Sequence, residues 1–159
     1  MESLIIDATK LADTRKIGRV IGRLLKPDDV LLLSGPLGAG KTTLTQGIAM
    51  GLGIKSGVMS PTFVLMREIQ GRLKLYHIDL YRLENIPEIT DMGLDDYFYG
   101  GGVTIVEWAD RAAGLLPPEH LRIEIEYTGD KSRRFRFYAC GERYRLLLRE
   151  INADIEDGK

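Results

Sequence analysis

The sequence contains a single cysteine, Cys140, among its 159 residues. One thiol cannot form a disulfide within the chain, and it cannot build a cysteine metal cluster. Stabilisation by an internal disulfide or by a cysteine-bound metal cluster is therefore excluded, and a reducing compartment is the expected environment.

Long apolar runs are also missing. Nothing in the sequence approaches the roughly 18 consecutive apolar residues that indicate a membrane span. The first residues, Met1–Asp7, lack the basic stretch and long apolar run of a secretion signal. We therefore expect a cytoplasmic protein that does not associate with a membrane.

A strong charge of one sign is absent, since 22 basic and 23 acidic residues leave a formal net charge of −1. No global basic field indicates a nucleic-acid-binding protein. The charge is uneven, however, since residues 84–96 are acidic and residues 131–149 are basic. The favoured interpretation is that both segments are solvated surface, and the alternative is that they form a pair of patches that face a partner. The acidic members are Glu84, Glu88, Asp91, Asp95 and Asp96, and the basic ones are Lys131, Arg133, Arg134, Arg136, Arg143, Arg145 and Arg149.

The most informative segment that is present, residues 35–42, reads Gly-Pro-Leu-Gly-Ala-Gly-Lys-Thr and fills the P-loop pattern G-x-x-x-x-G-K-[ST]. An apolar run at 30–33 enters it as a buried strand should, and a helix-compatible stretch at 42–52 leaves it. The glycines let backbone N–H groups turn toward a phosphate chain, beside the positive end of the helix. Lys41 can reach the outer phosphates, and the Thr42 hydroxyl can hold Mg²⁺. The segment predicts a nucleoside triphosphate site.

The remaining pattern predicts a single domain over residues 1–159, with a polar tail from about residue 150. Strands and helices alternate around the P-loop, but some neighbouring strands read as antiparallel hairpins. The fold class expected is α/β, a P-loop NTPase-like three-layer fold with a mixed, parallel and antiparallel, central sheet. We expect helices at 9–25, 42–52 and 109–115, a short helical excursion at 84–99 and a helix from residue 142. We expect strands at 4–6, 30–33, 64–69, 73–78, 103–106, 121–127 and 133–138.

Two carboxylates stand at the ends of predicted strands, Asp79 after residues 75–78 and Glu107 after residues 103–106. In P-loop folds the groups that serve the metal and orient water sit at such positions. Either one could instead cap the following turn. Thr62 is a candidate hydroxyl for the outer phosphate, although its spacing alone favours a plain turn. His77 is expected to be structural.

Four blocks together resemble one family, the TsaE (YjeE) family of small P-loop ATPases of bacterial tRNA threonylcarbamoyladenosine (t6A) synthesis. The blocks are Gly35–Thr43, Ser-Pro-Thr-Phe at 60–63, the segment Tyr76–Leu83 with His77 and Asp79, and Val-Glu-Trp at 106–108. The resemblance extends from the first predicted helix to about Arg136.

The resemblance implies a protein that binds ATP and Mg²⁺, hydrolyses ATP slowly alone, and acts with TsaB and TsaD, reaching tRNA only through that complex. It implies Lys41 and Asp79 as catalytic residues, with Asp79 alternatively linked to the metal through water, and Thr42 and Glu107 as metal-linked residues. The nucleotide-binding residues that it implies are Gly35, Leu37, Gly38, Ala39, Gly40, Lys41, Thr42, Thr43, Thr62 and Trp108.

Two other functions stay open at this point. A small-molecule or nucleoside kinase shares the size and the phosphate loop, and Arg133, Arg134 and Arg136 could be proposed as its lid, although they fall on a predicted strand. A nucleotide-gated binding module with negligible turnover is the other. A GTPase has less support because the sequence contains no N-K-x-D segment.

Overall fold

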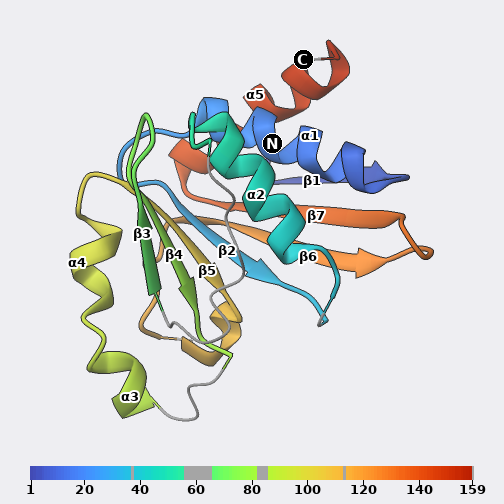
Figure 1. The fold of residues 1–159 in the computed structure, drawn as a ribbon. Coiled ribbons are helices and arrows are strands. Elements are labelled where there is room, and N and C mark those ends of the chain that lie inside the picture. The colour runs from blue at the N-terminus through green and yellow to red at the C-terminus, as the bar shows by residue number, and fades with distance from the viewer. Residues whose placement is uncertain (37, 56–65, 82–85, 113, 159) are drawn as a thin grey trace.

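The structure, a computed structural model, describes residues 1–36, 38–55, 66–81, 86–112 and 114–158 (Figure 1). A seven-stranded sheet runs through the molecule in the order β1-β7-β6-β2-β5-β4-β3. The strands are β1 (Ser3–Ala8), β2 (Val30–Ser34), β3 (Met66–Ile69), β4 (Leu75–Asp79), β5 (Val103–Glu107), β6 (His120–Tyr127) and β7 (Arg133–Cys140). The helices are α1 (Leu11–Leu24), α2 (Lys41–Gly51), α3 (Ile86–Thr90), α4 (Leu94–Phe98) and α5 (Glu142–Glu156), and η1 (Ala109–Ala112) is a 3₁₀ turn.

The centre of the sheet is parallel and its flanks are antiparallel. Strand β2 pairs in parallel with β5 and β6, and β5 pairs in parallel with β4. Strand β7 is antiparallel to β6 and β1, and β3 is antiparallel to β4. The predicted α/β fold with a mixed sheet is confirmed. Every residue of β4 and β5 and the first four of β2 are buried, because the sheet is covered on both faces there.

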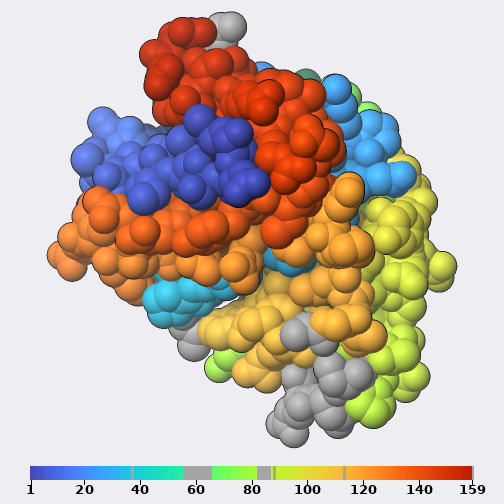
Figure 2. Space-filling model, turned by 180° about the vertical axis from the view of Figure 1, so that it is seen from behind, coloured from blue at the N-terminus to red at the C-terminus, as the bar shows by residue number. Residues whose placement is uncertain are grey.

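Two apolar clusters fill the space on the two faces of the sheet. Helices α1, α2 and α5 pack over one face, where the cluster includes Ile21, Ile48 and Leu147. Every strand except β3 contributes a buried residue to this cluster among the described residues, and Ile69 of β3 packs against it partly buried. Helices α3 and α4 and the η1 turn cover the other face only over β2, β5 and β4, around Phe98 and Ile78. In Figure 2 the back of β6, β7 (orange) and β1 (dark blue) forms part of the outer surface.

Helices α1 and α2 pack unusually closely because each carries a pair of glycines. A Cβ atom added at Gly22 would stand 2.1 Å from the Ile48 carbonyl oxygen, and one added at Gly51 would stand 2.4 Å from the Arg19 carbonyl oxygen. Gly18 and Gly47 face each other in the same way. Since α2 carries Lys41 and Thr42, this contact fixes the helix that follows the P-loop.

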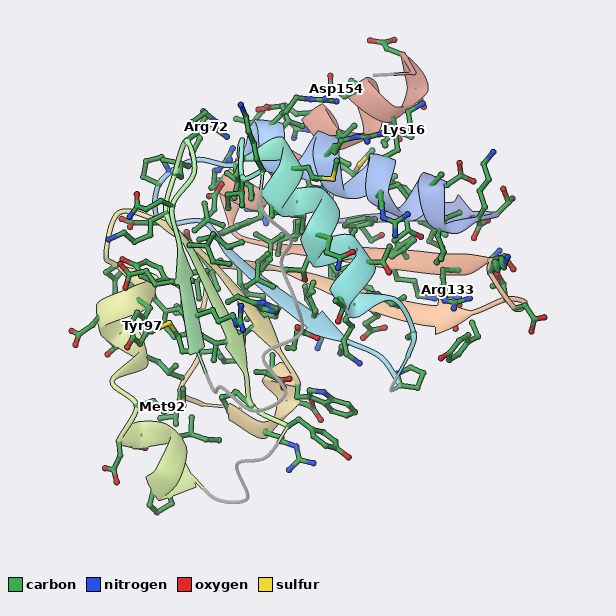
Figure 3. All side chains as sticks on the ribbon, in the orientation of Figure 1. Lys16, Arg72, Met92, Tyr97, Arg133 and Asp154 are labelled. Carbon is green, nitrogen blue, oxygen red and sulfur yellow. The ribbon has the colours of Figure 1, made fainter. Side chains whose placement is uncertain are left out.

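The turn between β3 and β4 holds the far end of α1. The Arg72 guanidinium donates to the Gly22 and Leu25 carbonyl oxygens at 2.8 and 3.3 Å, and Figure 3 shows Arg72 beside the end of that helix. These oxygens belong to the last turn of α1 and have no partner further along the helix. A cation in that position also complements the helix dipole.

The differences from the expected elements lie in short or terminal segments. The helix expected at 109–115 is only the η1 turn, because Gly114 adopts φ of +90° and prolines follow at 117 and 118. The excursion at 84–99 contains two five-residue helices, α3 and α4. Helix α5 continues to Glu156 with Ile151 buried, so residues 150–156 are helical where a polar tail was expected. Within the described ranges, no helix has the length and apolar character needed to cross a bilayer.

Candidate functional site

The P-loop joins the end of β2 to the start of α2 at the carboxyl edge of the parallel strands. Gly38 and Gly40 have φ of 76° and 110°, a left-handed region that other residues avoid. Gly40 is also the residue before the first turn of α2, and no side chain caps that turn within the described part of the chain. The N–H groups there are therefore placed to receive an anion. Leu37 lies outside the described residues.

Strand register brings the two predicted carboxylates together. Leu33 of β2 pairs with Glu107 of β5, and Glu107 pairs with Asp79 of β4, so three adjacent strands end in one row. Paired residues of a sheet point to the same face, so the two carboxylates project side by side. Glu107 and Asp79 are only 2% and 8% exposed. The loop begins two residues after Leu33, directly beside them.

Lys41 lies at the centre of this group. Its ammonium donates to the Gly35 and Pro36 carbonyl oxygens at 2.6 and 3.0 Å and stands 4.4 Å from the centroid of the Trp108 ring. Burial lowers the pKa of Lys41, while Glu107, Asp79 and Asp110 oppose that shift. The ammonium is therefore hydrogen-bonded to the loop and lies within the electrostatic influence of the carboxylates.

Asp79 is a buried carboxylate with one fixed oxygen. Its Oδ1 accepts the Tyr81 N–H at 2.9 Å. Burial raises the pKa of Asp79, and Glu107 adds to the rise, whereas the Tyr81 N–H, His77 and Lys41 lower it. A carboxylate with a raised pKa accepts a proton more readily, which suits a group that orients or deprotonates water.

Glu107 has a buried partner that sequence reasoning did not assign. The His77 Nε2 and the Glu107 Oε2 are hydrogen-bonded, and His77 is fully buried. His77 Nδ1 has no hydrogen-bond partner among the described residues. His77 therefore fixes one oxygen of Glu107, the candidate metal-linked carboxylate.

The oxygen donors of the site suit Mg²⁺ better than a softer metal. Glu107, Asp79 and the Thr42 hydroxyl in the first turn of α2 are hard ligands. The described residues include no group of three or more His, Cys, Asp or Glu that could hold a metal ion. Mg²⁺ is usually held by one or two carboxylates together with phosphate oxygens and water.

Trp108 and its neighbours form an aromatic edge to the site. Trp108 has φ of 58°, so the chain turns sharply directly after Glu107. The rings of Trp108 and Tyr81 are 4.9 Å apart, and the Arg111 guanidinium lies 5.9 Å from the Trp108 ring. The edge follows both carboxylates along the chain, because Tyr81 comes two residues after Asp79.

Among the other expected site residues, Gly35, Gly38, Ala39, Gly40, Thr42 and Thr43 lie in the loop or the first turn of α2. Thr62 lies outside the described residues. The site is thus assembled from the loop, α2 and the ends of β4 and β5.

Arg133 was expected at the surface and is instead buried against the P-loop. It is 6% exposed, and its Nε donates to the Ala39 carbonyl oxygen at 2.8 Å. The signal was available in the sequence: Arg133, Phe135 and Phe137 alternate with Arg134 and Arg136, so a period of two places Arg133 on the inner face.

The basic segment is largely neutralised within the molecule. Arg134 pairs with Asp7 at 2.8 Å, Arg136 with Glu126 at 3.2 Å, and Arg143 with the buried Asp29 at 2.6 Å. Arg145 pairs with Glu142 at 2.7 Å. Residues 131–149 therefore do not form a continuous patch of unpaired positive charge. The described acidic side chains, Asp91, Asp95 and Asp96, are exposed on or beside α3 and α4.

The chain is similar to known proteins over most of its length. The family model described as "Threonylcarbamoyl adenosine biosynthesis protein TsaE" matches residues 8–135. The "tRNA threonylcarbamoyladenosine biosynthesis protein TsaE" of Bacillus subtilis is 48% identical over 141 residues, 88% of each chain. The protein of the same name from Treponema pallidum is 43% identical over 121 residues, 76% of this chain and 90% of that one. A crystal structure of Bacillus subtilis YdiB superposes with a TM-score of 0.84 at 40% identity, covering 96% of this chain and 95% of that one.

Proposed function

This chain belongs to the TsaE family, and from that premise we propose that it binds ATP with Mg²⁺ at the P-loop and hydrolyses it in support of tRNA t6A modification. The relatives are named for threonylcarbamoyladenosine biosynthesis, which supports the process. The residues of the site support the chemistry.

The observation that carries the proposal is the shared row of strand ends. Asp79 and Glu107 are paired in register beside the P-loop, and Lys41 lies between the loop and Trp108. A phosphate cradle alone binds anions, but two buried carboxylates beside it would repel a phosphate unless a cation lay between them. The combination favours a metal–nucleotide complex over a simple anion.

Each residue then has a distinct task. The loop N–H groups and Lys41 bind the phosphates, and Lys41 would exchange its carbonyl partners for phosphate oxygens. Thr42 and the free oxygen of Glu107 would hold Mg²⁺, which neutralises charge on the phosphates when bound. Asp79, with its raised pKa, would orient the attacking water and accept its proton.

Partner stimulation is part of the proposal. Transition-state charge in phosphoryl transfer is often stabilised by an arginine supplied in trans. Arg133 lies behind the loop and bonds to a carbonyl oxygen. Arg134 and Arg136 project from strand β7 into ion pairs. We therefore propose slow turnover alone and faster turnover with TsaB and TsaD, with tRNA reached only through that complex.

The test is release of inorganic phosphate from ATP, measured with and without TsaB and TsaD. We expect slow release alone and a clear increase with the partners, dependent on Mg²⁺. Transfer of the phosphoryl group to an added nucleoside or small molecule, in place of release, would instead indicate the kinase. Saturable ATP binding with no turnover in either condition would indicate a nucleotide-gated binding module.

A further inference from the structure

Arg133 makes an unusual set of contacts for a buried guanidinium. Its Nε donates to the Ala39 carbonyl oxygen at 2.8 Å. Its Nη1 donates to the carbonyl oxygens of Gly129, Asp130 and Ser132 at 3.1, 3.0 and 2.8 Å. One side chain thus joins the P-loop to the β6–β7 turn, and Figure 3 shows Arg133 at that end of β7.

The bond to Ala39 has a consequence on the other side of the same peptide. The described residues contain no cis peptide bond, and in a trans peptide the C=O and the next N–H point in opposite directions. Fixing the Ala39 oxygen toward Arg133 therefore turns the Gly40 N–H away from β7. Gly40 directly precedes the first turn of α2, whose N–H groups no side chain caps in the described part of the chain.

The neighbouring contacts make the β6–β7 hairpin a rigid wall behind the loop. A Cβ atom added at Gly35 would stand 2.6 Å from the Ile125 carbonyl oxygen, and one added at Gly38 would stand 2.8 Å from the Tyr127 hydroxyl. The Arg133 guanidinium also lies 4.3 Å from the centroid of the Tyr127 ring. The loop therefore has little room to rotate its peptides while these contacts hold.

The charge of Arg133 is stabilised by backbone carbonyl dipoles and by the ring of Tyr127. Among the described residues Arg133 has no carboxylate within ion-pair distance, and all of its hydrogen-bond acceptors are carbonyl oxygens. A buried charge without a counter-ion is costly. An anion bound on the other side of the Ala39–Gly40 peptide would relieve that cost, so phosphate binding and Arg133 should be energetically coupled.

We propose that Arg133 is a positioning residue of the phosphate site, which holds the Ala39–Gly40 peptide so that the Gly40 N–H faces a bound phosphate. The inference rests on the proposed ATP site and adds a residue outside the P-loop motif. Lysine cannot replace the guanidinium of Arg133, because a single ammonium does not reach the Ala39 oxygen and the oxygens of the β6–β7 turn in the same geometry.

The test compares Arg133→Lys with a matched control, Arg134→Lys. Both keep the charge, and Arg134 is the next residue on the opposite face, paired with Asp7. ATP affinity is measured by calorimetry, and the Gly40 amide is followed by NMR during ATP addition. For Arg133→Lys we expect roughly tenfold weaker binding and loss of the ATP-induced Gly40 shift. Arg134→Lys should match the unaltered protein in both measurements.

The amide signals of α5, remote from the loop, report whether Arg133→Lys keeps its fold. Should that variant not fold, the unaltered protein still gives a decision, because the Arg133 Nε–H signal should shift on ATP addition while that of Arg134 does not. Unchanged affinity and an unchanged Gly40 shift in folded Arg133→Lys would overturn the inference, as would an unmoved Arg133 Nε–H signal. Weaker binding with a normal Gly40 shift would also overturn it, since the loss of affinity would then not come from the direction of the Gly40 N–H. An unaltered protein that binds no ATP removes the premise, and that result is distinct because it precedes any substitution.

Discussion

Lys41 is the residue whose removal should affect nucleotide binding most directly. Its ammonium is buried beside the loop carbonyls and Trp108. Lys41→Ala would remove the charge-assisted contact between this ammonium and the phosphates of bound ATP, which contributes about 1.5–3 kcal/mol to binding. We expect ATP affinity to fall roughly tenfold to a hundredfold, measured by calorimetry. An unchanged affinity in the folded variant would contradict the assignment of the site.

Glu107 should control the metal dependence of that binding. Glu107→Ala should weaken ATP binding in the presence of Mg²⁺ and change it little without the metal, because a metal-linked carboxylate is lost. The alanine variant also leaves the buried His77 without its partner, so Glu107→Gln is the better test. The glutamine keeps an oxygen for His77 and removes the charge. A Mg²⁺ titration of ATP affinity that is the same for Glu107→Gln and the unaltered protein would exclude the metal role.

Asp79 should separate turnover from binding. Asp79→Asn can still accept the Tyr81 N–H but cannot take a proton at neutral pH, so we expect near-normal ATP affinity and turnover reduced by roughly 10²–10³. Phosphate release and calorimetry measure the two quantities. If Asp79→Asn instead lost Mg²⁺-dependent binding and Glu107→Gln lost only turnover, the two roles would be exchanged.

The same substitution should stabilise the protein in the absence of nucleotide. Because burial raises the pKa of Asp79 above 3.8, its ionised form costs folding free energy at every pH above the raised value. Asp79→Asn removes that cost, by about 0.5–2 kcal/mol at neutral pH. The difference should shrink as the pH falls through the raised pKa and vanish below 3.8, where the folded and unfolded carboxyls are both protonated. Urea unfolding at several pH values measures it, and a difference that grows on acidification would contradict the argument.

Residue types and spacing were enough to find the P-loop, Asp79 and Glu107, because each is a local pattern at the end of an apolar strand. The pairing of His77 with Glu107 was not accessible in this way. It depends on β4 lying beside β5, and 30 residues separate the two side chains in the chain. Arg133 was misplaced for a different reason: its charge was weighed ahead of the period-two alternation that puts it beside Phe135.

At the scale of elements, the α1–α2 contact is the most restrictive feature of the fold. Gly22→Ala would place a Cβ atom 2.1 Å from the Ile48 carbonyl oxygen, and backbone cannot yield as a side-chain tip can. We expect a loss of about 2–3 kcal/mol in the free energy of unfolding, measured with urea. Helix propensity opposes this result, because alanine is favoured over glycine by about 1 kcal/mol in a helix interior.

The control is Met50→Ala on α2, at a position that is 47% exposed. It should change the stability by less than about 0.5 kcal/mol. Should Gly22→Ala prove neutral or stabilising, the close packing of the two helices would not hold in solution.

Elements were predictable from the sequence where they are long or strongly patterned. The strand before the P-loop, the helix after it and the alternating β6 and β7 are all present near their expected bounds. The expected helix at 109–115 is only the four-residue 3₁₀ turn Ala109–Ala112, since Gly114 adopts a left-handed φ of +90°. The order of the strands could not be read from local patterns, since β2 pairs with β5 and β6, both of which follow it by about 70 residues or more.

At the scale of the whole molecule, the uneven charge lies on two separate regions. Asp95 and Asp96 begin helix α4, and Arg134 lies on β7; both regions are visible from the same side of the molecule in Figure 2. Arg133 is no longer a suitable surface probe, because reversing its charge would break the contact with the P-loop. The partner-facing interpretation of the charge is therefore tested at Asp96 and Arg134.

We expect ATP turnover to rise when TsaB and TsaD are added, because an arginine that stabilises transition-state charge in phosphoryl transfer can be supplied in trans. Asp96→Lys and Arg134→Glu should each weaken association with that complex roughly threefold to tenfold at low salt, and less at high salt, where screening is stronger. Asp154→Lys on α5 makes the same change in net charge as Asp96→Lys at a remote position and should leave association unchanged. Calorimetry or light scattering at two salt concentrations measures association, and phosphate release measures turnover.

If the three variants behave alike, the net charge of the protein governs association with the complex, and no particular charged surface does. If turnover does not rise at all, partner stimulation is wrong and the kinase becomes the stronger candidate.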